Sequence, residues 1–197
     1  SRTVIYAYDK FNRRISENSS MTPGIEATFI FDSCPNGIGR LCTATNASST
    51  AVYEYNSMGA VSKETKTIKN KEQSKTFITT STYDTAGNAK TTIHPNGSIV
   101  SNTYDGLGRL AAIQKKESEN SPFTDVVKNF DYVPTGQVSR IDYANGVITL
   151  NTYDANRAYR LTRTRTTTQN SATTTFAYGT VLRNVAYTYA SIGNITY

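Results

Sequence analysis

The stretch that decides the fold is Tyr104-Asp105-Gly106-Leu107-Gly108-Arg109-Leu110. Its pattern is an aromatic residue, Asp, two free positions, Gly, a polar residue and an aliphatic residue. Asp at the start of a turn can accept a hydrogen bond from the backbone two residues on, and Gly four residues after the aromatic can take positive φ. These features close a hairpin loop of this length with a β-bulge. The stretch therefore predicts a strand ending in Tyr104, a turn, and a returning strand.

The pattern recurs about eight times along the chain. The first copy has Asn12 in place of Gly, and Asn is the next best residue at positive φ. The second copy reaches Gly39 through an insertion, Cys34-Pro35-Asn36-Gly37, and the copy at Tyr153 has two extra residues before Arg160-Leu161. The predicted anchor and turn residues are Tyr8, Asp9, Asn12, Phe31, Asp32, Gly39, Tyr55, Gly59, Tyr83, Asp84, Gly87, Tyr104, Asp105, Gly108, Arg109, Leu110, Tyr132, Gly136, Tyr153, Asp154, Tyr189 and Gly193.

Two markers keep the same register along the chain. The anchors Tyr83, Tyr104, Tyr132 and Tyr153 are separated by 21, 28 and 21 residues, which implies a double unit of 49 residues. A second marker, the dipeptides Asn96-Gly97 and Asn145-Gly146, is also 49 residues apart. Asn-Gly is the signal for a two-residue type I′ hairpin turn. The agreement indicates a repeat of β-hairpins.

Composition points to an all-β fold. Only 37% of residues are hydrophobic, Trp is absent, Thr is abundant and Tyr outnumbers Phe by 14 to 7. Thr, Tyr, Val and Ile favour strands, while helix formers such as Leu and Glu are scarce. We predict no helix, and one array of repeats over residues 1–197. Neither end carries an atypical capping unit, so we expect an excerpt of a longer array.

The stretches between copies are polar. Residues 63–75 are rich in Lys, Glu, Asn and Gln, residues 115–122 combine charged residues with Ser and Pro, and residues 166–175 are rich in Thr. We interpret all three as exposed hairpin tips or loops at one edge of the sheet.

The charge and the cysteines favour ordinary explanations. The net charge is +6 and the pI is about 9.3, but the basic residues are spread along the chain. We therefore expect a solvated sheet surface and no nucleic-acid partner. Cys34 and Cys42 could form one bridge or two free thiols; we favour thiols because the intervening residues look like a turn and two half-strands. No apolar signal segment and no run long enough to cross a bilayer is present.

The repeated polar residues look structural. The Asp series could supply acid–base groups or calcium ligands, but recurrence at a fixed offset favours turn capping. The Tyr series could form platforms for sugars, yet repeated strand aromatics more often pack against neighbouring hairpins. Arg40, Arg109 and Arg160 could bind anions, although stacking on the aromatic of an adjacent unit or pairing with a turn Asp is the preferred interpretation. The role of Arg109 stays open.

No catalytic, metal or cofactor site is predicted. His94 is the only histidine, at an expected hairpin tip, and any Ser/His/Asp or Cys/His arrangement would have to use it. One His and two Cys do not support a structural zinc site. Sequons at Asn18, Asn46, Asn96 and Asn194 are expected by chance in a chain this rich in Asn, Ser and Thr.

The copy at Tyr104 resembles the consensus of RHS repeats, also called YD repeats, and the resemblance covers nearly the whole chain. It implies antiparallel β-hairpins that pair side by side into a continuous, curved and spiralling sheet. In bacterial polymorphic toxins and in the C and B components of Tc toxins, such a sheet closes into a hollow shell around a C-terminal toxin domain. Teneurins use a similar shell in adhesion. The self-cleaving end of bacterial RHS cores carries Asp-Pro-x-Gly motifs, whereas this chain has no Asp-Pro.

The resemblance therefore predicts a non-enzymatic shell segment that helps to encapsulate a toxin or effector domain of a secreted or cell-surface protein. Its expected partners are other repeats of the same parent chain, copies of itself paired through sheet edges, and an enclosed toxin domain. The alternative is a surface adhesion module that binds glycans through exposed aromatic residues.

Overall fold

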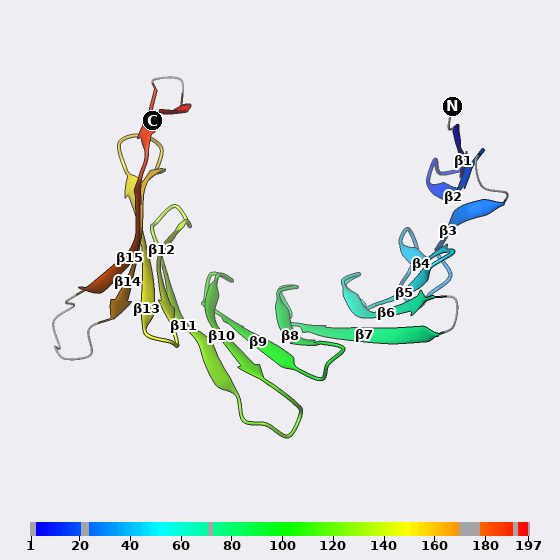
Figure 1. Cartoon of the computed structure of the whole chain (residues 1–197), viewed down its shortest axis with the longest axis horizontal. Coiled ribbons are helices and arrows are strands. Elements are labelled where there is room, and N and C mark those ends of the chain that lie inside the picture. The colour runs from blue at the N-terminus through cyan, green and yellow to red at the C-terminus, as the bar shows by residue number, and fades with distance from the viewer. Residues whose placement is uncertain (1–2, 21–23, 71–72, 170–177, 191–192, 197) are drawn as a thin grey trace. The chain divides into compact units, whose positions relative to one another are not determined.

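A computed structural model describes residues 3–20, 24–70, 73–169, 178–190 and 193–196. The chain divides into two compact units, Ser1–Ile99 and Val100–Tyr197. Within the described residues every regular element is a β-strand, as the scarcity of helix formers predicted. Figure 1 shows the strands of each unit, coloured in chain order.

The first unit is an antiparallel sheet whose strands pair in chain order. Its strands are β1 (Val4–Tyr8), β2 (Arg14–Ser19), β3 (Ile25–Phe31), β4 (Leu41–Asn46), β5 (Ser49–Tyr55), β6 (Val61–Lys69), β7 (Ser74–Tyr83) and β8 (Ala89–Ile93).

The second unit repeats this arrangement, again with antiparallel pairing in chain order from β9 to β15 and a separate small hairpin of β16 and β17. Its strands are β9 (Ile99–Tyr104, which begins at the boundary), β10 (Leu110–Lys116), β11 (Thr124–Tyr132), β12 (Val138–Tyr143), β13 (Val147–Asp154), β14 (Arg160–Gln169), β15 (Tyr178–Ala186), β16 (Thr188–Tyr189) and β17 (Ile195–Thr196).

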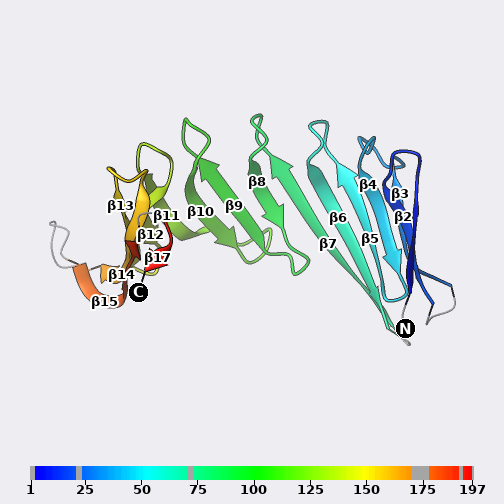
Figure 2. The ribbon, with the colours of Figure 1, turned by 90° about the horizontal axis from the view of Figure 1, so that it is seen from above.

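The aromatic-Asp turns of each unit lie along one edge of its sheet. They follow β1, β3, β5 and β7 in the first unit and β9, β11 and β13 in the second. Alternate turns of an antiparallel sheet must share an edge, because each hairpin reverses the chain. Figure 2 shows the turns after β3, β5 and β7 along one edge of the first unit. The repeat thus places successive copies of the turn pattern, with or without insertions, along one edge of each sheet.

The Asn-Gly turns differ from the predicted type. A type I′ turn needs positive φ at both central residues, but only Gly97 and Gly146 have it, at +85° and +80°, while Asn96 and Asn145 do not. In the first of them the Gly97 N–H donates to the His94 carbonyl over 2.9 Å. This is a type I turn followed by a left-handed glycine, and the type I′ prediction was wrong. Pro95, at the second turn position, has the fixed negative φ that suits type I.

Threonine forms a row across the first unit. Thr28, Thr45, Thr50, Thr67 and Thr76 are register partners from β3 to β7. Two of these pairs are also joined by a hydroxyl hydrogen bond: one links Thr67 and Thr76 at 3.0 Å, and in the other Thr45 donates to Thr50 at 3.5 Å. Branched side chains opposite one another stabilise neighbouring strands. The abundance of Thr therefore serves strand pairing.

The core is small. Among the described apolar residues, those that are buried are Cys42, Ile99, Val127 and Ile148. A sheet of one layer has little interior, so contacts between neighbouring hairpins must supply much of its stability, as in other repeat proteins.

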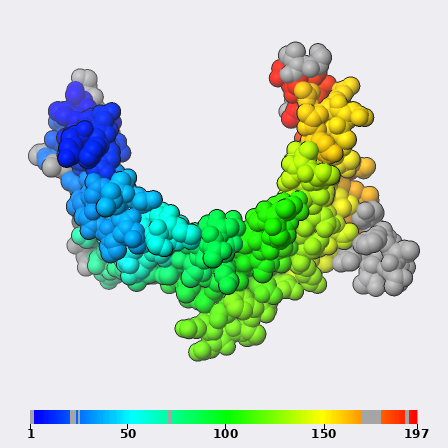
Figure 3. Space-filling model, turned by 180° about the vertical axis from the view of Figure 1, so that it is seen from behind, coloured from blue at the N-terminus to red at the C-terminus, as the bar shows by residue number. Residues whose placement is uncertain are grey.

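The three polar stretches take different forms. Most of residues 63–75 lies in β6 and β7, at the end of the hairpin that these two strands form, and residues 68–70 and 73–75 are exposed there, as expected for an exposed hairpin tip. Residues 117–123 form a loop between β10 and β11, and Figure 3 shows this yellow-green hairpin tip standing out from its neighbours in the second unit. Residues 166–169 belong to β14, and the rest of that stretch lies outside the described residues.

Candidate functional site

The turn at Asp105 is built by one carboxylate. Oδ1 of Asp105 accepts hydrogen bonds from the backbone N–H groups of Leu107 and Arg109, both at 2.9 Å. The backbone adds a bond from Gly108 N–H to the Asp105 carbonyl, and Gly108 has a φ of +76°. These donors, the Arg109 backbone N–H first and then its side chain, lower the pKa of Asp105. The Asp is therefore a charged cap of its own turn.

Other copies repeat this geometry with substitutions. The carboxylates of Asp9 and Asp84 accept from the same two backbone positions, and Asn56 does so through its amide oxygen. Asn12 takes the left-handed position with a φ of 60°. At Val133 no capping side chain exists, and the turn is closed by backbone bonds alone. The cap is thus replaceable, while the backbone course of the turn is retained.

The anchor tyrosines link each hairpin to the one before it. Five of the anchor hydroxyls each donate a hydrogen bond to the backbone carbonyl of the aliphatic residue that ends the preceding copy of the pattern. These bonds are Tyr55 to Leu41 at 2.6 Å, Tyr83 to Val61 at 2.7 Å, Tyr132 to Leu110 at 2.7 Å, Tyr153 to Val138 at 2.8 Å and Tyr189 to Leu161 at 2.8 Å.

We call this bond the tyrosine latch. It joins residues that are 14 to 28 positions apart in sequence, and it occurs in both units. Desolvation raises the pKa of Tyr132 and of Tyr153, as expected for phenols enclosed between strands. A protonated phenol is the form that donates, so burial favours the latch.

Arginine adds a second link at some latches. The Arg109 guanidinium lies 4.4 Å from the centre of the Tyr132 ring, while it also pairs with Asp105 at 2.7 Å. Arg40 and Arg160 lie over the rings of Tyr55 and Tyr189, each at 5.6 Å. Arg109 therefore joins its own turn to the anchor of the next hairpin, which answers the question its sequence position left open. Cation–π contacts of this kind contribute about 0.5–1 kcal/mol at exposed sites.

Solved structures share this architecture. TcdB2-TccC3 without its hypervariable C-terminal region aligns with 98% of this chain at a TM-score of 0.79 and 20% identity. TcdB2-TccC3 itself gives 0.77 at 19% identity, and the Tc holotoxin pore of Photorhabdus luminescens gives 0.74 at 20% identity. This chain spans 10% of the length of each of those chains. No protein-family model matches the sequence, nor does any curated protein.

The chain has the RHS-type hairpin fold. The resemblance noted from the repeat pattern is thereby confirmed at the level of the fold. In this RHS-type sheet the YD pattern has a direct structural meaning. Tyr and the aliphatic residue form the latch, and Asp and Gly shape the turn between them.

The second copy of the pattern has Phe31 at the tyrosine position, and Arg13 supplies the link to the preceding hairpin instead. Phe31 has no hydroxyl, but the Arg13 guanidinium stacks on its ring at 4.4 Å. Arg13 also donates to both carboxylate oxygens of Asp32, at 3.0 and 2.6 Å, and to Asp9 at 2.7 Å. The Arg13 side chain, first, and then the Gly39 N–H lower the pKa of Asp32 to about 2. A charged bridge therefore joins these two hairpins.

The cysteines of the RHS-type sheet are bridged. Cys34 and Cys42 form a disulfide with a Cα–Cα distance of 5.6 Å, and the described residues contain no free cysteine. The preference for free thiols was wrong. The insertion folds back through two successive turns, closed by Gly37 N–H to the Cys34 carbonyl and Arg40 N–H to the Gly37 carbonyl. This fold-back places Cys34 opposite the start of β4, which residue spacing alone does not reveal.

The remaining candidates do not assemble into a reactive site. His94 lies at the turn after β8, beside a shallow hollow whose lining also includes Lys75, Phe77, Pro95 and Ser98, with no carboxylate among the described lining residues. The described part of the chain contains no group of His, Cys, Asp and Glu able to hold a metal ion. Within those residues there is also no helix with the length and hydropathy to span a bilayer.

The glycan-binding alternative finds no support at the anchors. A sugar-stacking platform needs an open ring face. The Tyr55, Tyr132 and Tyr189 rings each carry a guanidinium, and their hydroxyls are engaged in latches. These rings are half-buried between neighbouring hairpins.

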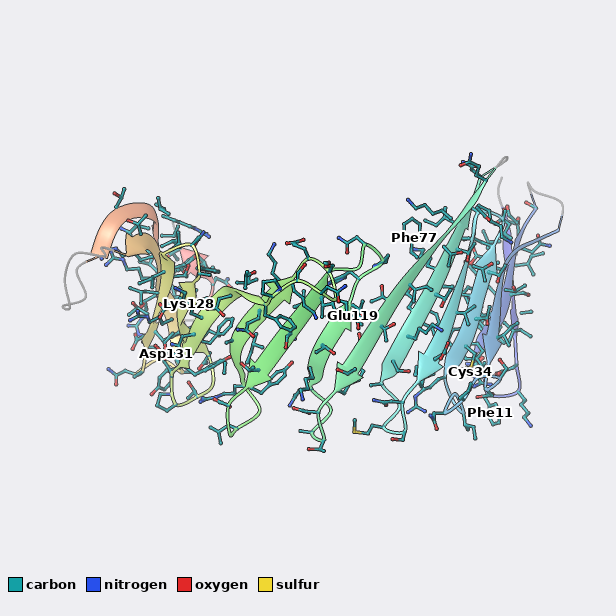
Figure 4. All side chains as sticks on the ribbon, turned by 90° about the horizontal axis from the view of Figure 1, so that it is seen from below. Phe11, Cys34, Phe77, Glu119, Lys128 and Asp131 are labelled. Atoms are coloured by element: carbon teal, nitrogen blue, oxygen red, sulfur yellow. A yellow bond between two sulfur atoms is a disulfide. The ribbon has the colours of Figure 1, made fainter. Side chains whose placement is uncertain are left out.

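Sequence reasoning missed the acceptors of the latch and the hydrogen bond that the Asn36 side-chain amide donates to the Tyr55 carbonyl. The acceptors are backbone carbonyls, which carry no residue signature. The constant aliphatic residue at the end of each copy was the available signal, because it marks where the returning strand begins. Figure 4 shows Phe11 and Cys34 at the turn edge of the first unit, with Phe77 toward the opposite edge.

Proposed function

We propose that this chain is a non-enzymatic structural segment of a larger RHS wall, and that its hairpins help to enclose a toxin or effector domain. The observation that carries the proposal is the latch, which recurs between successive hairpins in a sheet with almost no interior of its own. A repeated link from neighbour to neighbour suits a wall, since each unit then needs only the next one. The likeness to TcdB2-TccC3, over a tenth of that chain, supports the same role.

The proposal includes delivery outside the producing cell. The Cys34–Cys42 disulfide supports it, because disulfides persist in oxidising compartments and are rare in the cytosol. The chain's expected partners are then neighbouring RHS repeats and an enclosed domain.

Protease protection tests encapsulation. In the full-length protein that carries this segment, we expect the C-terminal region to resist limited trypsin digestion and to be cut quickly when produced by itself. Replacing Tyr132 by Ala removes a latch and should speed cutting of the C-terminal region, while Tyr8→Ala, at an anchor that is 53% exposed on β1, should not. Equal cutting of the C-terminal region inside and outside the full-length protein would overturn encapsulation.

The non-enzymatic part is tested separately. Purified chain should show no hydrolase or nuclease activity above buffer. Activity that disappears in a His94→Ala variant would contradict the structural role, because His94 is the only histidine available as a general base.

A further inference from the structure

The loop between β3 and β4 is held compact by its disulfide. The Cys34 N–H lies 3.0 Å from the Cys42 sulfur, and Cys42 is 1% exposed. Gly37 packs directly on the bridge, since a Cβ there would lie 2.4 Å from one sulfur and 2.7 Å from the other. The bridge and the glycine together fix how the insertion folds back.

This loop forms two hydrogen bonds to the backbone of the next hairpin. The Asn36 side-chain amide donates to the Tyr55 carbonyl at 2.9 Å. Arg40 Nε donates to the Gly59 carbonyl at 3.1 Å, and a Cβ at Gly59 would overlap the guanidinium. Two links thus come from the loop, beyond the latch from Tyr55 to Leu41.

Arg40 is oriented by carbonyls of the loop, whereas Arg109 is oriented by a carboxylate. Arg109 is oriented by the carboxylate of its own turn, Asp105. The corresponding carboxylate for Arg40 is Asp32, which instead binds Arg13 and the Gly39 N–H. Arg40 donates to carbonyls of the loop itself, most closely that of Ile38 at 3.1 Å. Those carbonyls keep their places only while the loop stays folded.

We propose that Cys34–Cys42 is a redox-sensitive staple that controls docking of this loop on the hairpin of β5 and β6. When the bridge is closed, Asn36 and Arg40 are held against the Tyr55–Gly59 turn. When it opens, the loop gains freedom and both links weaken. The inference rests on this chain's own contacts and holds whether or not the wall encloses a cargo.

The opening reaction needs a dithiol reductant. One of its thiolates attacks the sulfur of half-buried Cys34, and Cys42 leaves as a thiolate that takes up a proton. The second thiol of the reductant then displaces Cys34 from the mixed disulfide, which releases the cyclic disulfide of the reductant and a second protein thiol. Two electrons and two protons pass to the protein.

Hydrogen exchange followed by mass spectrometry tests the staple on the full 197-residue chain, with and without dithiothreitol. We expect reduction to speed exchange of the amides in residues 34–40 and 55–60 by on the order of ten- to a hundredfold, the range expected for releasing a short closed loop. The hairpin at residues 104–110 has the same Gly-Arg-Leu sequence without cysteines and should not change. Trypsin should cut after Arg40 faster on reduction, but not after Arg109.

A Cys34→Ser/Cys42→Ser double variant is the matched control. It should exchange at the reduced rate in both segments and should not respond to dithiothreitol. If the variant does not fold, the wild-type chain alkylated after reduction gives the same comparison. Unchanged exchange in residues 55–60 on reduction would overturn the proposal, and so would finding two free thiols in chain purified without reductant.

Discussion

The hairpin at Phe31–Leu41 and the hairpin at Tyr104–Leu110 reach the same contact by different means. In both, an arginine lies over the tyrosine ring of the next hairpin. The hydroxyl of that tyrosine donates a hydrogen bond to the backbone carbonyl of the Leu that comes directly after the arginine. At Tyr104 the arginine is oriented by Asp105, whereas at Phe31 a disulfide-closed insertion orients it. The turn interior is therefore variable, and the link between hairpins is what the repeat retains.

Removing an anchor ring should have the largest effect on the free energy of unfolding, and the loss should differ between the two hairpins. Tyr132→Ala loses the ring, the latch and the Arg109 contact, and we expect a loss of about 2–3 kcal/mol of unfolding free energy. Tyr55→Ala should lose less, about 1–2 kcal/mol, because Asn36 and Arg40 still bind backbone carbonyls of that hairpin. Urea denaturation of both variants measures the difference. Equal losses would show that the insertion contributes nothing to docking.

The glycine of the insertion offers the next test. Gly37→Ala should destabilise by about 2 kcal/mol, because its Cβ would overlap both sulfurs and the Cys34 carbonyl. Gly106→Ala in the unstapled hairpin is the matched control, since nothing lies within 4 Å of its Cβ position. Its Tm should stay the same or rise slightly. A neutral Gly37→Ala would mean that the loop can shift away from the bridge at little cost.

Removing only the latch hydroxyl should have a moderate effect. Tyr132→Phe leaves the Leu110 carbonyl without its donor and should cost about 1 kcal/mol. Tyr8→Phe, at an anchor 53% exposed, should change stability by less than about 0.5 kcal/mol. Thermal unfolding of the two variants, measured in parallel, gives the difference in their stability. If both respond alike, the hydroxyl bond is not what links the hairpins.

Acid should weaken the charged bridge between the first two hairpins, with the smallest effect. The folded pKa of Asp32 is about 2, below its ordinary 3.8. A depressed carboxylate pKa adds stability that is present above about pH 4 and is lost as the pH falls toward 2. Tm measured from pH 6 to pH 2 should therefore fall less for Asp32→Asn than for wild type. Glu119→Gln, in the exposed loop after β10, should follow the wild-type curve.

Much of the fold was predictable because its signals are local. Strand ends, turn positions and the left-handed residue follow from the order of Tyr, Asp and Gly, and Asn12 shows that even an imperfect copy is predictable. The type I′ prediction for the two Asn-Gly turns was wrong because it considered the dipeptide alone. In the first turn Pro95, just before Asn96, favours type I geometry, whereas the second turn adopts the same form with Ala144 at that position.

The order of residues along the chain is sufficient to predict a repeat of antiparallel hairpins with capped turns, because each of those features depends on residues only a few positions apart. The links between hairpins depend on the folded structure. The tyrosine latch uses backbone carbonyls that no side chain marks, and the Cys34–Cys42 bridge depends on how an insertion folds back. Both arise from contacts between hairpins, so their geometry appears only once neighbouring strands are placed side by side.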